Sequence, residues 1–166
     1  MKKIFLFIVI AFAAIGANAQ KTTYIAKVGG GIGGKEFKAY YVNAGFEVNF
    51  PISATNWTFS PSLHGIFNLD DRRGPHAVYM PLAFGYKVSL GNRWIFRPTL
   101  GPMVGYAIEN GDTHPGVIVG PDLGLNFERT HFSVGLQGFY SVTQLEREWH
   151  SDYNCTGAYL TFGYKF

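Results

Sequence analysis

One pair of residues in this sequence could carry out nucleophilic catalysis. His131 and Ser133 are separated by one residue, and a histidine that removes the proton of a serine hydroxyl makes that oxygen a nucleophile. The pair also needs a carboxylate to orient the imidazole. Glu146 and Glu148 would lie at the far end of the same strand, about 30 Å away at about 3.3 Å per residue. We therefore expect no catalytic residues, and interpret His131 and Ser133 as polar groups that face the interior of the fold.

Two other patterns could hold a ligand. Segment 29–34 contains the spacing G-x-G-x-x-G, which binds dinucleotide phosphates where a helix follows it. No helical periodicity follows here, so we interpret the segment as the glycine-rich end of a strand. The five histidines show no H-x-H or HExxH spacing, and Cys155 is the single cysteine. We therefore expect no intramolecular disulfide, no cofactor-binding residues and no metal ligands.

The elements that position these residues are predicted by an alternation of apolar with small or polar residues. Because successive side chains of a strand point to opposite faces, segment 156–166 is predicted to be a strand with one apolar face. The same alternation predicts eight strands of about 9 to 14 residues each, the length that a tilted strand needs to cross a bilayer. They are 24–32, 40–50, 57–67, 78–90, 94–108, 117–127, 132–140 and 156–166.

Segment 1–19 is predicted to be a signal peptide. Lys2 and Lys3 form a positive n-region, about a dozen apolar residues follow, and Ala17-Asn18-Ala19 fits an A-x-A cleavage site. The apolar stretch is shorter than the roughly 20 residues of a membrane-spanning helix. The predicted mature chain, 20–166, is one outer-membrane β-barrel domain.

The connections between the predicted strands alternate in length. Segments 51–56, 91–92 and 128–130 are short, 33–38 is intermediate, and 68–75, 109–116 and 142–154 are longer and polar. An even number of antiparallel strands puts both termini on one side, so the short turns would be periplasmic and the long loops external. The sequence thus predicts an all-β fold, an eight-stranded antiparallel up-and-down transmembrane β-barrel in the outer membrane.

Polar residues occupy the predicted inner face of this barrel. A buried charge needs a partner, so we expect Lys27 to pair with Glu47 and Arg97 with Asp122. The interior of an eight-stranded barrel is just filled by side chains, so no open pore is expected. Five residues are predicted to form an interior charge layer: Lys27, Glu47, Lys87, Arg97 and Asp122.

Prolines interrupt this pattern within the predicted strands. Proline cannot donate a backbone hydrogen bond, and a closed barrel has no edge strand on which the missing donor would be harmless. We therefore expect bulges or interrupted ladder positions at five residues: Pro61, Pro81, Pro98, Pro102 and Pro121.

Three local motifs accompany the signal and the eight strands. They are Tyr79-Met80-Pro81-Leu82, the glycine-containing segment 100–106 and the terminal Phe162-Gly163-Tyr164-Lys165-Phe166. Together these features resemble the small outer-membrane β-barrel domain proteins of the OmpA/OmpX type. The resemblance implies that outer-membrane lipid surrounds the chain and that Phe162, Tyr164 and Phe166 form a signal to the barrel-assembly machinery. Members of the family range from structural and adhesive proteins to lipid-modifying enzymes, so no single activity is implied.

Charge and loop composition indicate the class of function. Of 14 basic and 11 acidic residues, removal of Lys2 and Lys3 leaves a formal charge of +1, which is no footprint for nucleic acid. The longest connection carries Arg147, Trp149 and Tyr153, types that are enriched at binding hot spots. We expect a structural or surface-interaction role through the outer loops, with an extracellular partner. The alternative for these loop aromatics is an outer girdle or a plug of the barrel mouth.

Two other functions would distribute the residues differently. A lipid-modifying enzyme would bring a serine, a histidine and a carboxylate together on one lipid-facing patch, and we find no such set. A soluble lipocalin-like barrel that binds an apolar ligand would carry its apolar residues inside and its polar residues outside. The face on which the aromatic stripe lies therefore distinguishes a membrane barrel from a soluble one.

Overall fold

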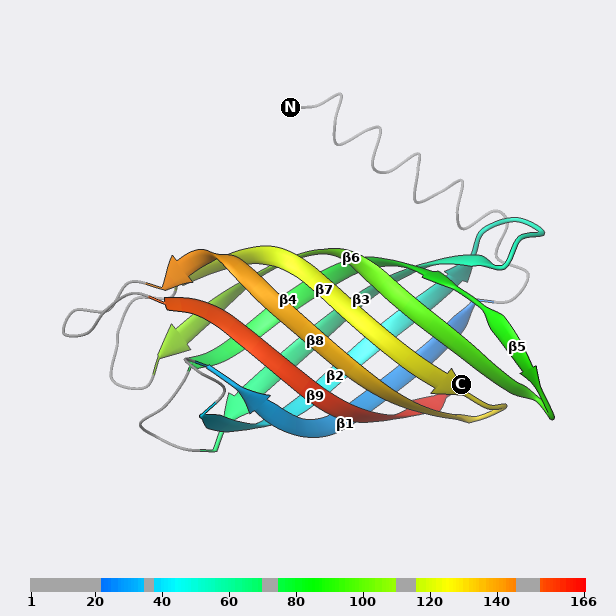
Figure 1. Cartoon of the computed structure of the whole chain (residues 1–166), viewed down its shortest axis with the longest axis horizontal. Coiled ribbons are helices and arrows are strands. Elements are labelled where there is room, and N and C mark those ends of the chain that lie inside the picture. Colours follow the sequence, from blue (N-terminus) through cyan, green and yellow to red (C-terminus); the bar gives the residue numbers. More distant parts are fainter. Residues whose placement is uncertain (1–21, 35–37, 70–74, 110–115, 146–152) are drawn as a thin grey trace, which may run out of the picture.

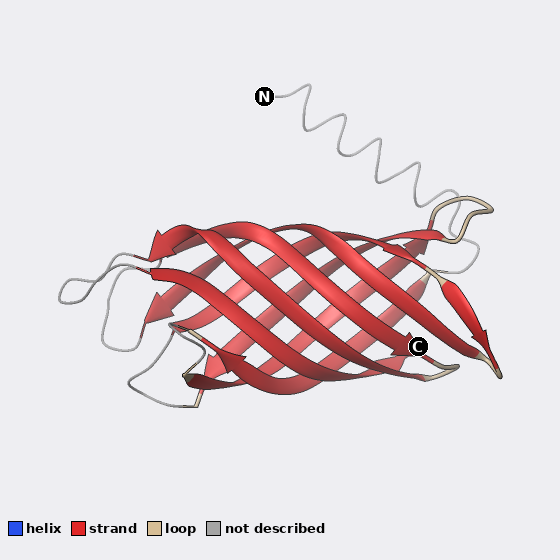
Figure 2. Ribbon diagram, in the orientation of Figure 1, coloured by secondary structure: helices blue, strands red, loops and turns tan. Residues whose placement is uncertain are grey.

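The computed structural model describes residues 22–34, 38–69, 75–109, 116–145 and 153–166, which fold as an antiparallel β-barrel (Figures 1 and 2). Among these residues no helix is long and apolar enough to cross a membrane. Nine strand segments are present: β1 Thr23–Gly33, β2 Ala39–Pro51, β3 Trp57–Asn68, β4 Pro75–Tyr86, β5 Val88–Gly91, β6 Trp94–Glu109, β7 Gly116–Glu128, β8 Phe132–Leu145 and β9 Tyr153–Lys165.

The strands close into a ring of eight. Apart from β4 and β5, strands that are neighbours in sequence pair antiparallel, and the ring is completed by the pairs β1–β9 and β4–β6. The short β5 pairs with β6 in the register that β4 already uses, so it continues β4 beyond Lys87 rather than adding a ninth position. The prediction of an all-β, eight-stranded, up-and-down barrel is confirmed.

Short turns gather at the end of the barrel where the chain finishes (Figure 1). The turn between β5 and β6 consists of Asn92 and Arg93, whose φ angles of 50° and 66° suit a two-residue hairpin turn of type I′. The turn between β7 and β8 is closed by a hydrogen bond of 2.8 Å from Arg129 N–H to Phe132 O. The short connections between strands therefore lie together at one end of the barrel, as the predicted alternation of connection lengths requires.

The apolar stripe of each strand lies on the outside. In β9 Leu160 and Phe162 are exposed, whereas Tyr159 and Thr161 are buried, and the same alternation holds along the other long strands. An apolar exterior around a polar layer is the arrangement expected for a barrel in lipid. It is the opposite of the arrangement expected for a soluble barrel that binds an apolar ligand.

The prolines do not mark bulges. Between β6 and β7 the register is continuous, with Pro98 opposite Leu125 and Pro102 opposite Pro121. Between β3 and β4 the ladder is interrupted after Pro61, but the register is the same on both sides of the interruption. Pro61 lies opposite Leu82, and His64 lies opposite Tyr79. Of the two predicted alternatives, bulges are absent at these prolines, whereas an interrupted ladder is present next to Pro61. What remains is a local interruption of the ladder, because proline removes a donor without inserting a residue.

The largest irregularity lies instead in β8. Three residues, 141–143, lie opposite the single residue Cys155 of β9. Side chains replace ladder bonds here: the Thr143 hydroxyl donates to Val117 O at 2.7 Å and accepts from Val119 N–H at 3.2 Å. The Asn154 amide donates to Ser141 O at 2.8 Å. Backbone groups at a membrane surface are thereby satisfied without regular pairing.

Glycines on the inner face permit close approach of neighbouring backbones at two seams of the wall. A Cβ on Gly31 of β1 would lie 2.7 Å from the Cα of Tyr159 in β9, and a Cβ on Gly101 of β6 would lie 2.6 Å from the Cα of Ala83 in β4. The two seams, β1–β9 and β4–β6, lie on opposite sides of the ring. Glycine there lets neighbouring backbones approach as a closed, curved sheet requires.

Candidate functional site

A chain of ion pairs crosses the barrel interior near its short-turn end. Arg97 is fully buried, and its guanidinium donates to Glu47 Oε1 at 2.6 Å, to Glu128 Oε1 at 2.5 Å and to Ser60 Oγ at 3.0 Å. Lys27 Nζ contacts Glu47 Oε2 at 2.5 Å, and Lys165 Nζ contacts Glu128 Oε2 at 2.7 Å. This charge chain links β1, β2, β6, β7 and β9, and it gives both of its carboxylates, Glu47 and Glu128, two cationic partners.

The predicted pair of Arg97 with Asp122 is wrong. In the register of β6 and β7, Arg97 lies opposite Asn126, and Asp122 lies opposite Gly101. Arg97 therefore meets Glu128, two residues nearer the turn than Asn126. The inward face of Glu128 could have been read from the sequence, because residues 122, 126 and 128 share the inward parity of β7. Lys87 lies between β4 and β5 with a partly exposed side chain.

A second polar group occupies the middle of the barrel. His64 Nε2 lies 3.1 Å from Ser62 Oγ and 3.5 Å from Gln137 Nε2, which in turn donates to the two carboxylate oxygens of Asp122 at 3.1 and 3.3 Å. The group holds a serine, a histidine and a carboxylate. However, Gln137 separates the imidazole from Asp122, so the direct bond that orients a catalytic histidine is missing. All five side chains, Asn43 included, are buried inside the barrel wall.

The interior toward the long loops is apolar, which sequence reasoning missed. Tyr79 contacts Phe139 with ring centroids 4.8 Å apart, and Phe139 stacks on Tyr159 at 6.0 Å. His64 stacks on Tyr79 at 5.3 Å, so the aromatic cluster rests directly on the polar group below it. Eleven buried residues form this aromatic plug: Ala39, Tyr41, Ile66, Ala77, Tyr79, Met103, Ala107, Ile118, Phe139, Cys155 and Tyr159.

The remaining sequence-predicted residues are placed as follows. Ser133 is buried inside, but His131 is exposed and its ring stacks on Tyr164 at 6.2 Å, so the expectation that His131 faces inward is wrong. Phe162, Tyr164 and Phe166 are exposed on the outer face. Arg147, Trp149 and the signal segment 1–19 lie outside the described residues, whereas Tyr153 begins β9.

No cluster of His, Cys, Asp and Glu suited to hold a metal ion is present within the described ranges. Cys155 is buried in the aromatic plug and forms no disulfide.

Solved structures with the same architecture include small barrels of bacterial outer membranes. The N-terminal β-barrel domain of Pseudomonas aeruginosa OprF aligns with a TM-score of 0.57 and 15% identity, over 89% of this chain and 98% of that domain. Neisserial surface protein A aligns with a TM-score of 0.65 and 8% identity, over 87% of this chain and 94% of that protein. The fold is that of the small outer-membrane β-barrels. The predicted resemblance is thereby confirmed for the fold.

No protein-family model matches the chain, and no curated protein matches it by sequence. At this level of identity the similarity concerns architecture. The location follows from the surface itself: a closed barrel whose outward residues are aromatic and aliphatic, such as Trp57, Leu63, Phe127 and Leu160, is matched to lipid. Barrels of this kind reside in the outer membrane.

Proposed function

We propose that this protein is a closed outer-membrane barrel with a structural or surface-interaction role, which it performs through its external loops. The observation that carries the proposal is the filled interior. The charge chain blocks the end near the short turns, and the aromatic plug blocks the end near the long loops. A barrel filled at both levels offers no aqueous path, which favours a scaffold over a pore.

The loops are the part of the molecule best suited to contact a partner. Loops held by a rigid scaffold are where binding residues usually lie. The connection between β8 and β9 is the longest in the sequence, and Arg147, Trp149 and Tyr153 are of types enriched at hot spots. The predicted connection 142–154 is shortened in the structure, because β8 runs to Leu145 and β9 begins at Tyr153. These residues support an extracellular partner that docks on the connection 146–152 and the adjoining Tyr153. The protein is proposed to be neither an enzyme nor a carrier of a cofactor.

The outward aromatic face of β9 supports a second partner during biogenesis. Phe162, Tyr164 and Phe166 are exposed and follow one another along the same face. We propose that the barrel-assembly machinery recognises this face before the seam between β1 and β9 closes.

Two measurements test the proposed function. In planar lipid bilayers the purified protein should produce no stable ionic conductance. A steady conductance with wild-type protein would show that the interior is open.

Replacement of segment 146–152 by a two-residue turn should leave the barrel folded and should remove binding to cells or matrix that the wild type shows. The matched control replaces segment 110–115 in the same way and should retain that binding. Binding that survives the first change and disappears with the second would move the partner site to the other loop.

A further inference from the structure

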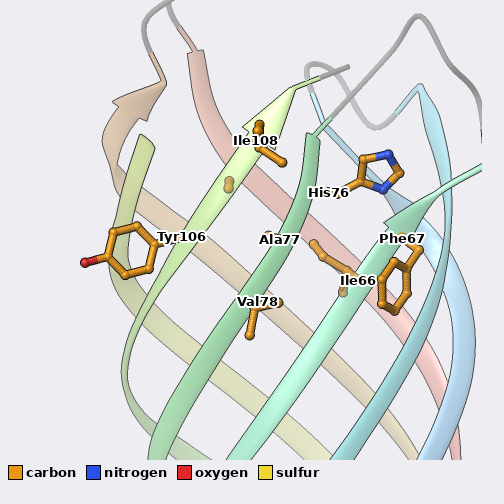
Figure 3. Close-up of a pocket in the computed structure, with 8 residues that line it drawn as sticks. Ile66, Phe67, His76, Ala77, Val78, Tyr106 and Ile108 are labelled. Carbon is orange, nitrogen blue, oxygen red and sulfur yellow. The ribbon is translucent and has the colours of Figure 1, made fainter. Parts of the chain in front are cut away.

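An apolar groove lies on the outer wall close to the long loops (Figure 3). It has a volume of about 220 Å³ and crosses β3, β4 and β6. On β4, Val78 lies between Gly65 of β3 and Tyr106 of β6, and His76 lies opposite Ile108 of β6. Its lining is almost wholly hydrocarbon: Ile66, Phe67, His76, Ala77, Val78, Tyr106, Ala107 and Ile108.

The groove has two raised sides and a low floor. Phe67 and Tyr106 lie on opposite sides of β4, with the smaller Val78 between them (Figure 3). Ile66, Ala77 and Ala107 lie side by side across the three strands, and their side chains point into the barrel as part of the aromatic plug, so that the floor of the groove is formed by backbone between the outward residues. Phe67, Val78 and Tyr106 are 51%, 53% and 61% exposed, so the groove opens to the surroundings of the barrel.

The upper end of the groove is polar. Asn68 N–H donates to His76 Nδ1 at 3.1 Å, and the His76 ring lies 6.4 Å from that of Phe67. Tyr106 contributes a phenol at the same end of the barrel. Tyrosine and other amphipathic rings mark the level at which headgroups meet hydrocarbon. The groove therefore begins at the headgroup level and runs into the hydrocarbon region.

We propose that this groove holds one acyl chain of an outer-leaflet lipid. It is continuous with the lipid-facing surface of the wall, and its lining offers a water molecule almost no polar partner, so a hydrocarbon chain suits it better than water. Because lipid already surrounds the barrel, binding is favoured by closer packing rather than by release of water. A second copy of the barrel presents a convex wall, which does not fill a hollow between two raised aromatic rings.

The test is photocrosslinking in vesicles. The full-length mature protein is inserted into phosphatidylcholine vesicles that contain phosphatidylethanolamine with a diazirine near the end of one acyl chain. In the wild type, adducts should be about fivefold enriched on peptides that contain Val78 and Tyr106, relative to peptides that contain the equally exposed Leu123 and Leu136. Even labelling of all outward residues would overturn the proposal.

Variants separate the groove from general contact with lipid. Val78→Trp fills the groove, so the enrichment should be lost. Val119→Trp adds the same ring to an outward position of β7 that does not line the groove, and should keep the enrichment. Folding of each variant is checked by its altered migration on unheated gels, and Ile108→Trp replaces Val78→Trp if that chain does not fold.

Two outcomes contradict the proposal. Enrichment that persists in a folded groove-filling variant would place the lipid elsewhere. A barrel dimer that is linked through β4 by chemical crosslinking and becomes monomeric in the groove-filling variant would assign the groove to a second copy.

Discussion

Arg97 organises the polar half of the interior because its fixed fork of donors reaches two carboxylates and a hydroxyl at once. A buried cation of this kind is costly unless its partners are well placed, and here Glu47 and Glu128 are themselves shared with Lys27 and Lys165. The five charges therefore act as one unit. Removal of Arg97, its central member, takes one cationic partner from each of two buried carboxylates, Glu47 and Glu128. Removal of Lys165, at the end of the charge chain, takes a partner from Glu128 alone.

Substitution Arg97→Met should destabilise the barrel by about 3–5 kcal/mol, because it leaves two buried carboxylates with fewer partners. Unfolding by urea in lipid vesicles gives the free energy. Combined with Glu47→Gln, it should deviate from additivity by about 0.5–3 kcal/mol.

The control pair is Arg97→Met with Asp122→Asn. Asp122 lies opposite Gly101, four residues from Arg97 along β6 or about 13 Å. These two changes should add to within about 0.5 kcal/mol. Strict additivity for Arg97 and Glu47, with coupling between Arg97 and Asp122, would contradict the observed register.

The error in the Arg97 pairing has a physical origin. Parity along a strand fixes the face of a residue, so the inward positions of Lys27, Glu47, Arg97 and Asp122 could be read from the sequence. The neighbour across the ladder depends on the stagger between strands, which a count from the predicted turns does not supply. Asp122 lies farther from its turn than Arg97 does, so the two side chains sit at different levels.

At the scale of elements, β8 depends on side chains where its ladder with β7 ends. Regular pairing between β7 and β8 extends from Glu128 to Asp122, and farther along the Thr143 hydroxyl joins Val117 and Val119 to β8. Residues 141–143 contain no glycine or proline that would signal this bulge. Sequence alternation through Tyr140 predicted a regular strand and then a loop.

Substitution Thr143→Val keeps the shape of the side chain but leaves Val119 N–H and Val117 O without their partner. We expect a loss of about 1–3 kcal/mol in the free energy of unfolding. Hydrogen exchange at Val119 should also become faster.

Thr58→Val is the matched control, because the Thr58 hydroxyl makes no hydrogen bond within the described part of the chain. It should be nearly neutral. An equal loss for both variants would mean that the hydroxyl of Thr143 does not hold the seam.

The glycine seams make a second prediction at this scale. Gly31→Ala places a Cβ against the Tyr159 backbone, so the strands must separate and stability should fall by more than about 1 kcal/mol. Gly30→Ala, one residue earlier, points outward and meets only Tyr41 O at 3.4 Å. It should be tolerated, and thermal unfolding in detergent measures the difference. Equal stability of the two variants would show that the seam is not close-packed.

Across the whole molecule, the interior divides into two halves that the sequence did not separate. Inward positions include both the charged residues and the rings of Tyr79, Phe139 and Tyr159. Period-two alternation shows which face of the strand a residue lies on, but not how high along the barrel axis it lies. The difference in polarity between the two faces is weakest where both faces are apolar. The strands, their order and the exterior were predictable. The aromatic plug was not, because it forms only when β4, β8 and β9 meet across the barrel.

The closed ring leads to the last prediction, which concerns assembly and location. With β1 paired to β9 and β4 to β6, the ring has no free edge, and unfolding in lipid must break a complete ladder. The protein should therefore fractionate with outer membranes. On gels without boiling it should migrate as a compact species that shifts after boiling. Gly31→Val, which forces the β1–β9 seam apart, should lower the boiling temperature needed for the shift, whereas Gly30→Val should not. Recovery of the wild-type chain as a soluble periplasmic protein, with one migration before and after boiling, would refute the membrane-barrel interpretation.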